Sequence, residues 1–371
     1  MRLTLALPFA LFAFACSSDD DSPKGGTGGG AGAGGSAASG GQAGYGGSSG
    51  GAAGSGGAAG SGGAAGSGGA AGSGGGSSVP TLLSETGLYS DIASETLAPG
   101  VEFYQPAHVL WTDDASKKRW ALVPTGAQID TSDMDYWVYP VGTKFFKEFS
   151  RDGTRVETRM LHKTATDKWV MIAYQWNTDQ KDAVAVPNGV QNASGTPHDI
   201  PSTADCDTCH GKMTDRGLSF TAIQLSHGLT GTKLSDLIAQ NRLTHPPAGH
   251  FTLPGTAAQQ AALGYMHANC GTCHNDYSFV FSLVDMRLWL GTASLSTVAD
   301  TFTTKTTVNK PLTAAGASAG ATARIVPGDS STSDVFLRMN ERGTARQMPP
   351  LGTEDVHADG SALIKAFIES L

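Results

Sequence analysis

Four of the five cysteines stand in two identical frames of five residues. Residues 206–210 read Cys-Asp-Thr-Cys-His, and residues 270–274 read Cys-Gly-Thr-Cys-His. In each frame, two thiols three positions apart share one side of a helical turn, and a histidine follows directly. This spacing is typical of haem c attachment, in which both thiols bond the vinyl groups and the imidazole ligates the iron. The sequence therefore predicts two covalently bound haem c groups, held by Cys206, Cys209 and His210 and by Cys270, Cys273 and His274.

Paired cysteines also occur in zinc sites and in redox disulfides. The two pairs of a zinc ribbon are usually separated by roughly 15–20 residues, whereas 60 residues lie between Cys209 and Cys270. Neither alternative needs a histidine directly after both pairs. We therefore expect two haems, with one haem, zinc and disulfides as the alternatives.

The N-terminus has the pattern of an export signal. Arg2 precedes an apolar run over residues 3–15, which is too short to span a bilayer, and Cys16 follows small residues at positions −3 and −1. The segment resembles a bacterial lipoprotein signal, which implies lipidation of Cys16, although Phe14 departs from the usual pattern. An ordinary secretory site would be cut at the same bond, and an uncleaved anchor is the third alternative. We expect residues 1–15 to be a signal peptide and the mature protein to lie outside the cytoplasm.

Residues 25–78 carry 28 of the 50 glycines and no charged residue, and four copies of Gly-Gly-Ala-Ala-Gly-Ser run from 50 to 73. Such a segment buries too little apolar surface to offset the entropy of ordering. We therefore expect residues 16–78 to be a disordered linker that tethers the rest of the chain to a lipid anchor in the membrane. The net charge of −8 argues against a nucleic-acid partner.

Five of the six tryptophans lie between residues 101 and 200. Short β-rich runs at 120–123, 136–139, 144–149, 155–161 and 169–176 alternate with turn signals, and Asp152-Gly153 favours a hairpin turn. We therefore expect residues 79–200 to form an antiparallel β module, a sandwich or barrel, with the tryptophans in its core. A platform for a carbohydrate or a partner protein is the alternative role for the tryptophans.

The second frame stands in a recognisable setting. Residues 256–269 have helical spacing, with Thr256 as a cap, and residues 361–371 place apolar side chains on one helical face. A helix that leads into the frame and a terminal helix packed across it resemble class I cytochrome c. The resemblance implies a cytochrome c-like domain over 256–371 in which Met348, between His274 and the terminal helix, is the sixth iron ligand. Met339 is the weaker candidate.

The sixth ligand of the first haem, in the segment 201–255, is less evident. Met213 is only three residues from His210, too near to reach the opposite face of the ring. The sequence leaves His227, His245, His250 or an open or water-bound position. An iron whose sixth position is open permits a reaction at the metal, whereas an iron whose sixth position is filled by a side chain mainly permits electron transfer.

The wider pattern covers roughly residues 101–371. The strings at 110–115, 118–120, 140–143, 147–149, 157–159, 174–177, 325–329 and 348–350, together with both frames, resemble an uncharacterised bacterial family of secreted dihaem c-type cytochromes. The resemblance implies an α+β chain, with a β module followed by a mainly α-helical haem region.

The functional expectation is electron transfer between extracytoplasmic donor and acceptor proteins, carried out by a lipoprotein of the periplasm or cell surface. One alternative is a peroxidase-like dihaem oxidoreductase whose first haem is open. The other is a binding module in which the β segment captures a ligand.

Overall fold

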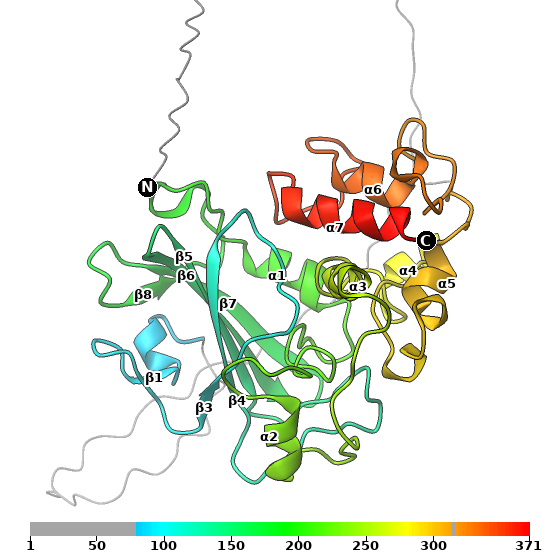
Figure 1. The fold of residues 1–371 in the computed structure, drawn as a ribbon. Helices are drawn as coiled ribbons and strands as arrows, with labels where there is room; N and C mark the ends of the chain where they lie inside the picture. The colour runs from blue at the N-terminus through cyan, green and yellow to red at the C-terminus, as the bar shows by residue number, and fades with distance from the viewer. Residues whose placement is uncertain (1–78, 314–315) are drawn as a thin grey trace, which may run out of the picture. The chain divides into compact units, whose positions relative to one another are not determined.

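The computed structural model describes residues 79–313 and 316–371. The predicted signal peptide, the predicted lipidation site Cys16 and the predicted tether lie outside the described residues. The N-terminal half is built on a six-stranded antiparallel sheet (Figure 1). Each strand pairs with the next one in the chain, in the order β3 (Val101–Phe103), β4 (Ser116–Leu122), β5 (Lys144–Arg151), β6 (Thr154–Ala165), β7 (Lys168–Trp176) and β8 (Ala183–Ala185).

The hairpin between β5 and β6 forms where the sequence predicts it. Asp152 and Gly153 connect the two strands, and their φ angles of 48° and 79° are both positive. Two consecutive positive φ angles are what a type I′ turn requires. Four of the five predicted strands coincide with or overlap β4, β5, β6 and β7. The strand predicted at 136–139 is wrong, because Val138 forms only an isolated bridge with Asp130.

One face of the sheet is covered by the chain that precedes it. Trp120, Phe146 and Trp176 project from this face into an apolar core with Leu83 and Leu88. The covering segment contains the 3₁₀ turn η1 (Leu83–Glu85) and a small hairpin of β1 (Tyr89–Asp91) and β2 (Thr96–Leu97).

The opposite face is covered by the chain that follows the sheet. Ala121, Phe145 and Leu161 contribute to a second core, which also takes in Cys206 of α1 (Thr203–His210) and Leu234 of α2 (Leu234–Ala239). The short 3₁₀ turn η2 (Ala193–Gly195) precedes α1. The first cysteine frame is therefore part of the layer that closes the sheet.

The expected α+β class is confirmed, but the β module is neither a sandwich nor a barrel. The large sheet is open, and its second face is closed by α1, α2 and their loops instead of by a second large sheet. Runs rich in β-branched and aromatic residues mark strands in both architectures, and they do not show what covers the sheet. Residues 201–255 thus complete the core of the sheet. The described residues belong to one compact unit.

A third core fills the C-terminal part. It is formed largely by α3 (Ala257–Asn269) and α7 (Ala358–Glu369), which pack against each other (Figure 1). Thr256 caps α3 as predicted, since its Oγ1 accepts a hydrogen bond from the backbone N–H of Gln259. The intervening chain carries α4 (Phe279–Val284), η3 (Thr292–Ser294), η4 (Val298–Asp300), α5 (Phe302–Thr307), η5 (Ser330–Thr332) and α6 (Asp334–Met339). None of the described helices is long and apolar enough to cross a membrane.

Candidate functional site

The first frame occupies the C-terminal half of α1. The helix begins with a capping box, in which Ser202 Oγ accepts from the N–H of Asp205 and Asp205 Oδ2 accepts from the N–H of Ser202. Cys206 is buried against the sheet core and Cys209 is half-buried. Burial raises the pKa of both thiols. Both are free thiols on one helical turn, which is the arrangement that covalent attachment needs.

His210 is held by a backbone carbonyl. Its Nδ1 lies 2.7 Å from the carbonyl oxygen of Arg216. Burial lowers the pKa of His210 to about 4, so the ring is neutral near pH 7. A neutral imidazole that donates through Nδ1 presents Nε2 as a lone-pair donor, and this arrangement is common among metal-bound histidines.

The loop that supplies this carbonyl is anchored in the sheet by Asp215. Its Oδ2 accepts hydrogen bonds from Lys163 Nζ and from the N–H of Tyr139, both at 2.6 Å. Its Oδ1 accepts from Trp169 Nε1 at 2.7 Å. Asp215, which precedes Arg216, is thus held by residues from three parts of the sheet module. Neither Asp215 nor Lys163 was predicted from the sequence, although a lysine in phase with the core-facing positions of β6 signals a buried partner.

The second frame forms a tight turn at the end of α3. The N–H groups of Cys273 and His274 both point to the carbonyl of Cys270, at 3.1 and 3.0 Å. Gly271 is required because a Cβ there would lie 2.6 Å from the carbonyl oxygen of His267. The four cysteines in the described residues form no disulfide.

His274 is only 7% exposed. Its carbonyl accepts hydrogen bonds from the N–H groups of Leu288 and Trp289, at 2.8 and 3.1 Å. Burial lowers the pKa of His274 to about 4, and the backbone carbonyl of Met286 opposes this shift. Nδ1 is buried without a hydrogen bond that meets ordinary geometry among the described residues. The ring is therefore a neutral imidazole held chiefly through its backbone.

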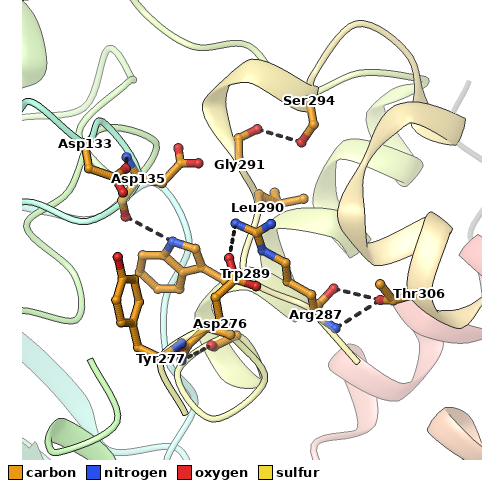
Figure 2. Close-up of polar contacts among 12 residues, drawn as sticks. Asp133, Asp135, Asp276, Tyr277, Arg287, Trp289, Leu290, Gly291, Ser294 and Thr306 are labelled. Carbon is orange, nitrogen blue, oxygen red and sulfur yellow. Dashed lines mark hydrogen bonds and ion pairs between the residues drawn. The ribbon is translucent and has the colours of Figure 1, made fainter. Parts of the chain in front are cut away.

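The segment that holds His274 is itself fixed by a loop of the β module (Figure 2). Trp289 Nε1 donates to the carbonyl of Asp135 at 3.1 Å, and the N–H of Thr292 donates to Asp135 Oδ1 at 2.7 Å. Arg287 forms an ion pair with Asp276 at 2.8 Å, two residues after His274. Asp135 therefore anchors the segment of Trp289 and Thr292 to this loop through both its carbonyl and its carboxylate.

The two frames lie next to each other. Asn275, which follows His274, places its Nδ2 3.5 Å from the sulfur of Met213, which lies three residues after His210. The ammonium group of Lys212 lies 4.7 Å from the centre of the Phe279 ring in α4. After burial itself, the Cys209 thiol is the next cause of the raised pKa of Cys273. Residues 64 positions apart are thus brought to one place.

Met348 lies in the loop between α6 and α7 and is half-buried. Its N–H donates to the carbonyl of Arg338 at 3.0 Å, and Arg342 Nη1 lies 3.5 Å from its carbonyl oxygen. Met339 instead packs into the core between α3 and α7. Met339 thus packs against an apolar core of the described residues and Met348 does not, and the role of Met348 as a ligand stays a prediction.

The histidine candidates for the first haem differ in their contacts. His227 uses both ring nitrogens, because Nε2 lies 2.6 Å from the carbonyl of Gln105 and Nδ1 accepts from the N–H of Leu229 at 3.0 Å. His245 is exposed and its Nδ1 bonds to Thr244, while His250 is exposed as well. Ligation by His227 would thus require one of its hydrogen bonds to break.

Two other histidines, His267 and His108, were not predicted from the sequence as site residues. His267 is 1% exposed, its Nδ1 accepts from the N–H of Leu290 at 3.1 Å, and its Nε2 is buried without a partner in the described part of the chain. His108 lies against Gly264 of α3, where a Cβ would overlap its ring. Burial lowers the pKa of His267 to about 3 and that of His108 to about 4. Their neighbours in sequence carry no signal of this burial.

No protein-family model, curated protein or solved structure matches the chain. The resemblance to dihaem cytochromes therefore rests on the residues quoted for it.

Proposed function

We propose that the chain is a dihaem c-type cytochrome that transfers electrons between donor and acceptor proteins outside the cytoplasm. The observation that carries the proposal is the placement of two C-x-x-C-H frames side by side, each with free thiols and a neutral histidine, which is half-buried at His210 and buried at His274. Adjacent frames support electron transfer within the chain, from one haem to the other.

The described side chains fit two haems better than the alternatives. The thiols of Cys206 and Cys209 would hold one haem and those of Cys270 and Cys273 the other, with His210 and His274 as proximal ligands. Across residues 79–313 and 316–371, no three His, Cys, Asp or Glu side chains are grouped so that they could hold a metal ion. The contact of His210 Nδ1 with the carbonyl of Arg216 suits a ring that ligates through Nε2.

Haem c supplies a reversible one-electron Fe(III)/Fe(II) couple. The chain's own part is to keep both imidazoles neutral, to exclude water and to set the two reduction potentials. Met348 as the sixth ligand of the second haem would raise its potential above that of the first. This difference in reduction potential would favour electron transfer from the first haem to the second.

The place of action follows from the N-terminal pattern. A lipidated Cys16 with a flexible tether would hold the haem-bearing unit at the periplasmic or cell-surface side of a membrane. The negative net charge would favour basic electron donors and acceptors through weak steering.

A peroxidase-like oxidoreductase is the second candidate. It is favoured by the contacts of His227, whose two ring nitrogens are both engaged, and by the exposure of His245 and His250. An open first haem would bind carbon monoxide or cyanide and turn over peroxide. Two six-coordinate haems that bind neither would exclude this candidate.

The deciding experiment is a haem count on the full chain, expressed in a host with c-type maturation. Intact mass and a pyridine haemochrome spectrum should give two covalent haems. C206A/C209A and C270A/C273A should each retain one, while the matched controls T208S and T272S, inside the same frames, should retain both. One or no haem on the unmodified chain would overturn the proposal.

A further inference from the structure

Three cations form a row across the face of the sheet that α1 covers. Arg119 of β4 pairs directly with Lys147 of β5, and Lys147 pairs with Arg159 of β6. Side chains directly opposite on neighbouring strands lie roughly 5 Å apart at Cβ and share one face. These three residues are called the basic row below.

The basic row by itself destabilises the fold. Like charges directly opposite each other destabilise a sheet, and Arg119 is only 5% exposed. Arg159 is neutralised by a two-pronged contact with Glu157, at 2.5 and 2.9 Å. The same carboxylate also bonds His198 Nε2 at 2.8 Å, which leaves it little capacity for the rest of the row.

Two members of the row therefore lack a counter-ion. The side chains of Arg119 and Lys147 form no hydrogen bond or ion pair with any other described residue. Lys147 has only a cation–π contact, with its Nζ 4.8 Å from the centre of the Phe149 ring. Buried or half-buried cations are normally paired, so two unpaired ones side by side indicate a bound anion.

The basic row lies beside the first frame. α1 packs against β7, the strand next to β6, and Cys206 shares a core with Ala121 and Phe145 of the row's own face. A group attached to this frame would therefore lie on the same face of the sheet as the basic row.

We propose that Arg119 and Lys147 bind the two propionate carboxylates of the haem attached to Cys206 and Cys209. Arg159, already paired with Glu157, borders the site. The inference rests on the proposed function, because it names the residues that recognise the haem at one of the two frames. The Lys147 ammonium and the Arg119 guanidinium can each bind a carboxylate, and a guanidinium donates in the planar geometry that a carboxylate accepts.

The proposal predicts the sign of an electrochemical effect. Cations near a haem favour the reduced form, which carries one positive charge fewer. Removing them should lower the potential of the first haem and leave the second unchanged. Because the row is repulsive, its removal should not weaken the fold of the protein without haem.

The test uses the full chain, matured with haem, and compares R119Q, K147Q and the double variant with the parent. K168Q, which removes an exposed lysine at the start of β7, is the matched control. Spectroelectrochemical titration should show the equilibrium constant for reduction of one haem falling at least tenfold in the double variant, or about 59 mV for one electron. Resonance Raman spectroscopy should show a shifted propionate-bending band, with R119K and K147R closer to the parent.

Intact mass distinguishes a failure of the proposed function from a failure of the role proposed for the basic row. A parent without haem on the first frame overturns the proposed function. A double variant with two haems, parent-like potentials and an unchanged propionate band overturns the role of the basic row alone. An equal fall of potential in K168Q would also overturn it, because the effect would then be one of general surface charge.

Discussion

Lys163 Nζ lies 2.6 Å from Asp215 Oδ2, and the two side chains are 1% and 6% exposed. This buried ion pair joins β6 to the loop whose carbonyl holds His210. Removal of one partner of a buried ion pair strongly destabilises the fold, because the remaining charge stays buried with neither water nor an opposite charge beside it.

D215N should therefore destabilise the protein by about 3–5 kcal/mol. The asparagine retains an oxygen for the N–H of Tyr139 but leaves the Lys163 ammonium without an opposite charge. Urea unfolding of the protein without haem measures the loss.

K163M with D215N provides the control, because the double variant removes both charges. Its loss should be clearly smaller than that of D215N alone. Equal losses in the two variants would mean that the hydrogen bonds of Asp215, and not its charge, carry the effect.

Burial of His267 makes stability depend on pH. The pKa of this ring falls from 6.5 to about 3 in the folded state. Between these values the unfolded state binds more protons, so stability is present above the unfolded pKa and is lost as pH falls. Going from about pH 7 to about pH 4, this one group should remove about 3 kcal/mol.

H267N tests this assignment, since the asparagine oxygen can accept from the N–H of Leu290 as Nδ1 does. The slope of unfolding free energy against pH should flatten in H267N and stay parental in H245N, which alters an exposed histidine. A parental slope in H267N would place the acid sensitivity on other groups, such as His108.

The strands could be read from the sequence, but their layering could not. Short β-rich runs between turn signals and the Asp152-Gly153 pair are local signals, and they located β5, β6 and β7. Whether a second sheet or helices cover those strands depends on contacts between distant residues. The sheet face that meets Leu234 carries the same pattern as one that would meet another sheet.

The candidate site, like the fold, could be predicted from the sequence only in part. Both cysteine frames are visible because attachment imposes a spacing on neighbouring residues. The adjacency of the frames is not visible, because it depends on Met213 meeting Asn275. Arg119, Lys147 and Arg159 belong to three strands, so only the pairing register brings them together.

Ligation by Met348 should have a spectroscopic signature. M348A should lose the methionine-to-iron charge-transfer band and lower the potential of one haem, because a thioether ligand raises it. M339A, which truncates a methionine packed between α3 and α7, should keep the band while losing stability. Retention of the band in M348A and its loss in M339A would reverse the assignment.

The packing of α7 on α3 depends on one glycine. A Cβ at Gly360, in the first turn of α7, would overlap the phenol ring of Tyr265. G360A should therefore destabilise the protein by about 1–3 kcal/mol, as overpacking does. G249A, at an exposed position where a Cβ meets nothing within 4 Å, is the matched control and should stay near the parent.

A double-mutant cycle separates this overlap from the intrinsic effect of alanine. Tyr265 also lies 3.2 Å from His357 Nδ1 through its hydroxyl, so Y265L has a cost of its own. If the ring is the obstacle, G360A should cost less in the Y265L background than in the parent, with a coupling of about 1 kcal/mol. Additive losses, measured by urea unfolding, would show that α7 accommodates the methyl group elsewhere and that Gly360 is not what sets the approach of the two helices.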